Sequence, residues 1–322
     1  MNGIKIFISG HKGMVGSAIL RLLKKKNVKL LCKDRKELDL TNQKKVINFL
    51  NKERPDEIYI AAAKAGGIYA NSTYPADFIY TNIMIEANLI HSAFKCGIKK
   101  ILLLGSSCIY PRNSKQPIKE EELLNGYLEP TNEPYAIAKI AGIKMCESYN
   151  RQYGLSHGID FRCVMPTNLY GPHDSYSPLS SHVIPALIRK FHEAKIKKKP
   201  YVVIWGTGLP RREFLHVDDL ARACVRIMKI KKIDYKNFTK ENCSHINVGS
   251  GYDLTILELA KKIMKIVGYV GDLRFDSSKP DGMRQKLLDS SRIRKLGWKP
   301  KINLEDGLVK VYKNYQIYLC KQ

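Results

Sequence analysis

The sequence predicts an α/β protein with a Rossmann-type doubly wound parallel sheet and a smaller mixed α/β C-terminal domain. Short apolar runs alternate with helical patterns through the first part of the 322-residue chain, as in a parallel sheet crossed by helices. A Gly-x-x-Gly-x-x-Gly turn follows the first run at once, and the alternation loosens after residue 170. We therefore predict one domain over 1–170, completed by part of 215–250, and a second domain over 171–322.

The first strand is expected over residues 4–9, with a helix from Met14 through Leu23. The glycines between them permit a tight turn and a close approach of the backbone to a ligand, and the helix N-terminus would face a pyrophosphate. This placement predicts dinucleotide binding. The residues expected at the cofactor here are Gly10, His11, Lys12, Gly13, Met14, Val15 and Gly16.

The segment that follows the second strand, expected over 28–32, bears on the choice between two cofactors. An NAD enzyme usually carries an acidic residue there, which binds the ribose hydroxyls. Asp34 is of that type, whereas Arg35 and Lys12 could clamp the 2′-phosphate of NADP. We favour NADP and leave NAD open. Asp39 is a candidate for the adenine end of the site, with a helix N-cap region as the alternative.

Two further buried strands are expected over residues 58–63 and 100–104. The first is rich in alanine, which lets a cofactor approach the backbone. Ser106 and Cys108 come just after the second, at the edge where doubly wound sheets hold their ligands. The proline- and charge-rich stretch over 110–134 is too long for a turn, so we expect it to fold over a ligand.

Tyr135 and Lys139 form the most informative pair in the sequence. Pro134 and the alanines after it favour a helix, in which Tyr135 and Lys139 are i and i+4 and share one face. A tyrosine with a pKa of about 10 is a poor proton shuttle at neutral pH, and a lysine one turn away stabilises its phenolate. Ser106 could hold the same substrate oxygen while a hydride reaches the carbonyl carbon. A solvated helix face is the alternative for Tyr135 and Lys139.

A helix expected over residues 81–95 bears Asn82 and Asn88. Either amide could orient Lys139 through water, and packing or capping is the alternative. The remaining elements expected are a strand over 162–165, a helix opened by 181–185, a strand over 201–205, and helices over 256–267 and 304–315.

Composition places the chain among soluble globular proteins, with 44% hydrophobic and 26% charged residues. No apolar run approaches the roughly 18 residues that span a bilayer, and the first residues do not have the layout of a signal peptide. We expect a cytoplasmic protein without membrane contact. The eight cysteines include no Cys-x-x-Cys pair, which favours free thiols, and we expect no metal site.

The net charge of +25, from 55 Lys+Arg against 30 Asp+Glu, raises the hypothesis of a nucleic-acid partner. The lysines are spread along the chain in short runs, such as 24–26 and 197–199, and no DNA-binding motif accompanies them. We interpret the excess mainly as a compositional bias and expect no nucleic-acid partner. A smaller part of the excess could help to capture anionic small ligands.

Together these motifs resemble the extended short-chain dehydrogenase/reductase family, over essentially the whole chain. The glycine turn and the Tyr-x-x-x-Lys pair are common to that superfamily, whereas Ser-Ser-Cys-Ile-Tyr-Pro and Ser-His-Val-Ile-Pro look specific to one activity within it. The stretches that carry the resemblance, besides Ser-His-Val-Ile-Pro at 181–185, are 10–18, 61–64, 66–68, 73–80, 105–111, 128–139, 166–174 and 212–219.

The resemblance implies a two-step conversion of GDP-4-keto-6-deoxy-D-mannose to GDP-L-fucose with NADPH. First, protons at C-3 and C-5 are removed and replaced from the opposite face, with Cys108 implied as the base and His182 as the acid. A thiolate fits if nearby positive charge lowers the pKa of Cys108 from about 8.5. Then hydride reaches C-4, and Tyr135 protonates the oxygen that Ser106 holds. Lys139 is implied to lower the pKa of the tyrosine and to bind the nicotinamide ribose.

From the residues alone, Cys108 would be a core thiol and His182 the start of a helix. The resemblance assigns both to catalysis. It also adds cofactor contacts, which are Leu40, Ala62, Leu104, Gly105, Ser106, Tyr135, Lys139, Pro166, Thr167, Asn168, Leu169 and His182. It makes 1–170 the NADP-binding domain and 171–322 the GDP-sugar-binding domain, and it implies a homodimer with two helices from each subunit.

For the substrate, the resemblance implies contacts from Lys190, Trp205, Arg212 and Asp281. Two cations suit a diphosphate, and an aromatic ring suits packing. Lys190 and Lys12 stand where the family often has arginine, so the bidentate grip on phosphate is expected to be weaker there.

Two alternatives remain. Another nucleotide-sugar enzyme, a GDP-mannose 4,6-dehydratase or a UDP-hexose 4-epimerase, would keep and recycle its cofactor, and the pairing of Cys108 with His182 argues against it. A non-catalytic NADP-binding sensor belongs to a different class. Such a protein has no use for the intact set of Ser106, Tyr135 and Lys139.

Overall fold

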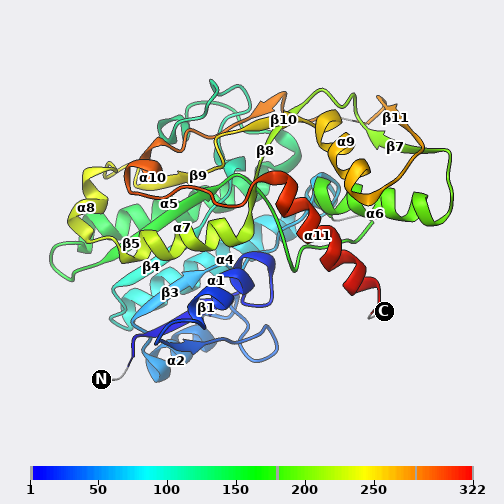
Figure 1. Ribbon diagram of the computed structural model, residues 1–322. Helices are drawn as coiled ribbons and strands as arrows, with labels where there is room; N and C mark the ends of the chain where they lie inside the picture. The colour runs from blue at the N-terminus through cyan, green and yellow to red at the C-terminus, as the bar shows by residue number, and fades with distance from the viewer. Residues whose placement is uncertain (1–2, 179–180, 280, 321–322) are drawn as a thin grey trace.

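The structure, a computed structural model, describes residues 3–178, 181–279 and 281–320. Its centre is a six-stranded sheet in the order β2-β1-β3-β4-β5-β9, with every neighbouring pair parallel (Figure 1). The strands are β1 Lys5–Ser9, β2 Lys29–Leu31, β3 Glu57–Ile60, β4 Lys100–Leu104, β5 Asp160–Pro166 and β9 His245–Val248. The predicted doubly wound parallel sheet is confirmed.

Helices cover both faces of this sheet. Because side chains alternate along a strand, Ile58 and Ile60 of β3 face one layer of helices and Tyr59 faces the other. The first layer holds α2 (Gln43–Glu53), α4 (Pro75–Lys95) and α5 (Glu133–Tyr153), and the second holds α1 (Met14–Leu23) and α7 (Val217–Lys229). Both faces of the sheet are therefore buried beneath helices.

The strand order reverses beside β1, because β2 lies on one side of it and β3 on the other. Doubly wound sheets bind ligands at the carboxyl ends of the strands beside such a reversal. The glycine turn follows β1, and the 3₁₀ turn η1 (Ser107–Ile109) comes shortly after β4. The topology thus brings these two sequence motifs to the same edge.

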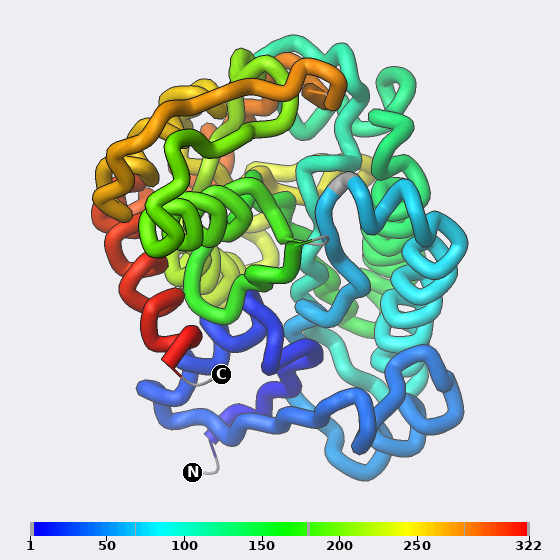
Figure 2. The backbone as a smooth tube through the Cα atoms, turned by 90° about the vertical axis from the view of Figure 1, so that its right-hand side faces the viewer, coloured from blue at the N-terminus to red at the C-terminus, as the bar shows by residue number. Residues whose placement is uncertain are grey.

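A smaller lobe lies beyond that edge (Figure 1). Its sheet is centred on β8 (Arg211–His216), which pairs with β6, β10 and β12, while β7 pairs with β11. His192 of α6 contacts Tyr312 of α11, and this contact joins the two helices. Figure 2 shows both helices on the left of the view. The elements of this lobe are β6 Asn168–Tyr170, α6 Val183–Ile196, β7 Tyr201–Trp205, β10 Asp253–Thr255, α9 Ile256–Val267, β11 Asp272–Asp276, β12 Gln285–Lys286 and α11 Leu304–Leu319.

Short elements complete the chain. They are α3 Ile68–Thr73, α8 Lys232–Asn237, α10 Ser291–Lys295, and the 3₁₀ turns η2 Glu120–Glu122 and η3 Pro130–Asn132. No helix within the described ranges is long and apolar enough to cross a membrane.

Several expected boundaries differ from those observed. The strand expected over 58–63 ends at Ile60, because the alanines that follow have little strand preference and leave the sheet. The helix expected over 81–95 begins earlier, with Pro75 in its first turn, where proline is well tolerated. The stretch 110–134 packs back on the core, where Ile118 bridges to Leu288, and only its last residues reach the cavity described below. The division into domains at residue 170 stays a prediction.

Candidate active site

The turn after β1 is shaped by two glycines. Gly10 has φ +73°, and a Cβ there would lie 2.7 Å from the Cα of Ala62. A Cβ on Gly16 would lie 2.2 Å from the carbonyl oxygen of Gly10. The first turn of α1 can therefore lie against the loop with its N–H groups open, which is the cradle that a dinucleotide pyrophosphate requires.

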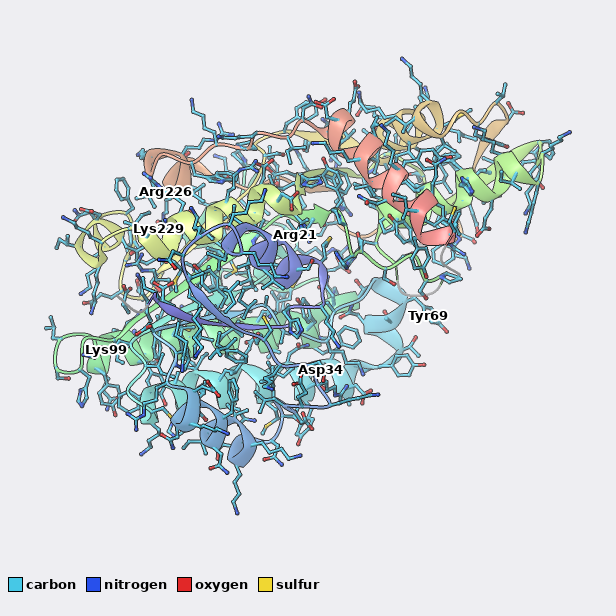
Figure 3. The ribbon with its side chains drawn as sticks, turned by 60° about the horizontal axis from the view of Figure 1, so that its bottom comes forward. Arg21, Asp34, Tyr69, Lys99, Arg226 and Lys229 are labelled. Carbon is cyan, nitrogen blue, oxygen red and sulfur yellow. The ribbon has the colours of Figure 1, made fainter. Side chains whose placement is uncertain are left out.

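Of the two cations proposed for a 2′-phosphate, Lys12 is already paired with a carboxylate. Lys12 Nζ lies 2.7 Å from Asp34 Oδ2, and Asp34 is labelled in Figure 3. The hydrogen bond from Lys12 lowers the pKa of Asp34 to about 2. Arg35 is exposed and makes no hydrogen bond or ion pair with the described residues. Arg35 is thus an uncommitted cation at this end, and Lys12 offsets the carboxylate that would repel a phosphate.

Beyond the turn lies one cavity of about 630 Å³, a size typical of small-molecule sites. All five residues predicted to be catalytic line it, namely Ser106, Cys108, Tyr135, Lys139 and His182. All four predicted substrate residues line it too, namely Lys190, Trp205, Arg212 and Asp281. The cofactor residues that line it are Gly13, Met14, Val15, Leu104, Gly105, Pro166, Thr167, Asn168 and Leu169, with Ser106, Tyr135, Lys139 and His182 shared.

The other predicted cofactor residues lie outside the cavity wall, and they are Gly10, His11, Lys12, Gly16, Arg35, Asp39, Leu40 and Ala62. Asp39 is engaged locally, since its carboxylate accepts from the backbone N–H of Thr41 at 3.0 Å and from its hydroxyl at 2.7 Å. The N-cap of α2 is Asn42. The position of Asp39 is therefore explained by a turn contact before the helix, and its role toward adenine stays a prediction.

Tyr135 and Lys139 lie one turn apart on α5, and the Lys139 ammonium is 5.7 Å from the centre of the tyrosine ring. Burial raises the pKa of Tyr135 to about 12, and Lys139 opposes this rise without reversing it. Lys139 therefore acts on the tyrosine pKa in the direction expected from the sequence, but burial has the larger effect in the protein alone. Desolvation outweighs the single positive charge, so the phenol stays protonated.

Cys108 is buried in η1, and its backbone N–H lies 3.5 Å from Ser106 Oγ. Burial raises the pKa of the Cys108 thiol, and Lys286 is the strongest opposing influence, followed by Ser106 and Lys139. Nearby positive charge thus lowers this pKa, as a thiolate requires, but does not outweigh burial in the protein alone. Lys286 belongs to β12 and lines the cavity. Parallel pairing of β12 with β8 places it beside Arg212.

His182 occupies the N-cap position of α6, but its ring makes no capping hydrogen bond. The helix-start alternative therefore accounts for its position and not for its side chain. Asp174 interacts electrostatically with His182, and burial raises the pKa of Asp174. Asp174 Oδ2 is buried without a hydrogen-bond partner in the described structure.

The far end of the cavity is cationic and partly aromatic. Lys190 Nζ lies 5.5 Å from the centre of the Trp205 ring and donates to the carbonyl oxygen of Val203 at 3.0 Å. Burial lowers the pKa of both Lys190 and Arg212, so an anion at this end would relieve an unfavourable desolvation. Asp281 accepts from the backbone N–H and the hydroxyl of Thr207, both at 2.7 Å. It holds the turn after β7 as well as facing the cavity.

The two asparagines considered as partners of Lys139 are used elsewhere. Asn82 exchanges hydrogen bonds with the backbone of Lys64, and Asn88 donates to the carbonyl oxygen of Leu40. The residue that contacts Lys139 from α4 is Glu86. Its place in the apolar stripe of α4, between Ile85 and Leu89, was a usable signal, because a lone acid on a buried face needs a partner.

Sequence reasoning missed the roles of Lys286 and Asp174. Lys286 stands at no recognisable spacing from the catalytic motifs, and it reaches the cavity because the C-terminal lobe folds over the edge of the large sheet. Asp174 lies within the stretch 166–174 that carries the resemblance and eight residues before His182, so its place in the sequence was a usable signal.

Known proteins with similar sequences and folds are nucleotide-sugar enzymes. Residues 6–249 match the model of the NAD dependent epimerase/dehydratase family. The chain is 57% identical over 314 residues to a GDP-L-fucose synthase of Escherichia coli (strain K12), covering 97% of each chain. A solved GDP-6-OMe-4-keto-L-xylo-heptose reductase from C. jejuni is 40% identical with a TM-score of 0.92, covering 99% of both chains. A GDP-L-fucose synthetase from Naegleria fowleri bound to NADP is 25% identical with a TM-score of 0.88, covering 99% of this chain and 96% of that one.

Proposed function

The chain belongs to the NAD dependent epimerase/dehydratase family, and we propose that it converts GDP-4-keto-6-deoxy-D-mannose to GDP-L-fucose. The conversion is a 3,5-epimerisation followed by reduction of the 4-keto group with NADPH. The observation that carries this proposal is that a Cys–His pair and a Ser–Tyr–Lys set line the same cavity. One bound sugar can then meet both sets without leaving the site.

Epimerisation needs a base and an acid that flank the sugar ring, because each proton leaves one face and returns to the other. The 4-keto group acidifies the protons at C-3 and C-5. Cys108 removes each proton as a thiolate, and His182, supported by Asp174, returns one from the opposite side. Lys286 favours the thiolate against the desolvation of its buried site.

Reduction uses the other set of residues. Bound NADPH supplies a hydride for C-4. Tyr135 donates its hydroxyl proton to O-4, and Ser106 holds that oxygen by a hydrogen bond. Lys139 stabilises the phenolate that remains and has one N–H free for the cofactor ribose, because its other two are already engaged.

The GDP group fits the cationic end of the cavity. Arg212 and Lys190 suit its phosphates, and the exposed ring of Trp205 offers a packing surface. NADP(H) is the cofactor. We further propose a cytoplasmic homodimer in which α4 and α5 of each subunit meet, supported by the exposed apolar side chains of Tyr80 and Ile137. Light scattering on the purified protein tests the dimer.

The decisive experiment incubates the protein with the 4-keto sugar and NADPH in deuterated water. We expect consumption of NADPH, formation of GDP-L-fucose, and deuterium at C-3 and C-5. A second candidate is reduction at C-4 alone, which the close fit to the heptose reductase favours. That activity would consume NADPH and leave both carbons without deuterium. Bound NADPH without turnover would reject both candidates.

A further inference from the structure

The lysine at the centre of the proposed reduction has a buried acidic partner. Lys139 Nζ donates to Glu86 Oε1 at 2.7 Å and to the carbonyl oxygen of Leu104 at 2.9 Å. The side chains of Lys139 and Glu86 are 2% and 1% exposed. Glu86 belongs to α4 and Lys139 to α5, so the ion pair joins two adjacent helices behind the cavity.

Packing against α5 restricts the position of the Glu86 carboxylate. A Cβ at position 142 of α5 would lie 2.0 Å from Glu86 Oε2, so Gly142 provides the room that the carboxylate occupies. Oε2 has no hydrogen-bond partner among the residues described. A buried ion pair with an unsatisfied oxygen contributes little net stability, because desolvation offsets the attraction. Stability alone therefore does not explain an acid at this position.

The charges around the Tyr135 hydroxyl show what the acid can do. Lys139 favours the phenolate, whereas Glu86 and Cys108 of η1 disfavour it. Glu86 in turn acts electrostatically on Lys139 and on the thiol of Cys163 on β5, and it raises the pKa of both groups. The pair of Glu86 and Lys139 is close to neutral as a unit, so Tyr135 experiences less positive charge than a lone lysine would supply.

We propose that Glu86 is a positioning residue for the reductive step: it fixes the Lys139 ammonium and offsets its charge, so that Tyr135 is held as a protonated donor. This inference rests on the proposed function for the direction of proton transfer. In reduction the Tyr135 O–H bond breaks, the O-4–H bond forms, and the hydride from NADPH reaches C-4. A lone Tyr–Lys pair favours the phenolate, which suits the reverse oxidation.

Glu86→Gln separates charge from contact, because the amide keeps an acceptor for Lys139. The phenolate absorbance of each protein is titrated against that of its Tyr135→Phe counterpart, which isolates one tyrosine among the 18 in the chain. We expect the midpoint of Tyr135 to fall by about one pH unit or more in Glu86→Gln. The alkaline limb of kcat for reduction should fall with it. The inference would be overturned if Tyr135 titrated with the same midpoint in Glu86→Gln and in the wild-type protein.

Glu147→Gln is the matched control. Glu147 is also 1% exposed and pairs with Lys144 at 2.8 Å, but it lies eight residues beyond Lys139 on α5, or about 12 Å along the helix. Its loss should leave the titration of Tyr135 unchanged. An equal shift in this variant would show a general effect of buried acids and would reject the assignment to Glu86.

Glu86→Asp keeps the negative charge but moves the carboxylate away from Lys139 by the length of one methylene group. This variant tests the positioning role if Glu86→Gln does not fold. We expect a lower kcat for reduction and an unchanged KM for the sugar, with the alkaline limb in place. A wild-type kcat in Glu86→Asp would reject the positioning role of Glu86. The titration needs no substrate. A shifted midpoint in Glu86→Gln, together with a wild-type protein that does not turn over the 4-keto sugar, would reject the proposed function and leave only the electrostatic effect of Glu86 on Tyr135. Normal turnover by the wild-type protein, with an unshifted Tyr135 midpoint in Glu86→Gln, would support the proposed function and reject the inference.

Discussion

Lys286 is expected to control the reactivity of Cys108, and Lys286→Met tests this directly. Two cations oppose the effect of burial on the Cys108 thiol, Lys286 first and Lys139 after it. The charge of Lys139 is largely cancelled by Glu86 at 2.7 Å, whereas Lys286 makes no ion pair in the part of the chain that the structure describes. Lys286 is therefore the effective charge on the thiol, and its removal raises the pKa of Cys108.

The size of the effect follows from the loss of one uncompensated charge. An opposite charge close to a buried group changes the pKa by about one unit or more, which is a tenfold change in thiolate at a fixed pH. We expect the alkylation of Cys108 by iodoacetamide in Lys286→Met to be about tenfold slower at pH 8. Lys286→Arg should restore most of the rate, because it restores the charge.

Site-resolved mass spectrometry measures this rate without any substrate. Cys320 is exposed and serves as a reference thiol on the same molecule. The reasoning would be refuted if Cys108 were alkylated at the wild-type rate in Lys286→Met while Cys320 also kept its rate. A rise in the KM for the sugar nucleotide with unchanged alkylation would instead assign Lys286 to substrate binding.

Five further outcomes are expected. Tyr135→Phe should lower the rate of NADPH oxidation by about 10²–10⁴-fold, with NADPH affinity retained in a fluorescence titration, because only the proton donor is lost. Cys108→Ser should abolish deuterium exchange at C-3 and C-5 and leave a slow reduction at C-4. Gly16→Ala should weaken NADPH binding and destabilise the protein by about 1–3 kcal/mol in thermal unfolding, since its Cβ would lie 2.2 Å from a carbonyl oxygen of the turn. Asp34→Asn should favour NADPH over NADH, measured as the ratio of their dissociation constants, because Lys12 is released for phosphate. The pKa of Asp34 is lowered from 3.8 to about 2 in the folded protein, so its stabilising contribution is complete above pH 4 and is lost as the pH falls through 2. Acid unfolding of Asp34→Asn should lack this component.

Local patterns in the sequence were sufficient for the framework of the site. The strand 100–104 and the helix 14–23 are observed with the predicted bounds, because each carries its own apolar pattern and its own end signals. The glycine turn and the i, i+4 relation of Tyr135 and Lys139 also follow from neighbouring residues alone. The cavity that gathers all the predicted catalytic and substrate residues is consistent with the family resemblance. Their individual roles stay predictions.

Contacts between distant segments decided the rest. Glu86 meets Lys139 across 53 residues of sequence, and Lys286 reaches Cys108 from the far end of the chain. Burial, which is a property of the folded molecule, raises the pKa of both Tyr135 and Cys108 by more than the nearby lysines lower it. Sequence spacing states which charges are one helical turn apart. The free energy of ionising a group depends on every charge and on the water excluded around it, and these are set only when α4, α5 and the C-terminal lobe pack together.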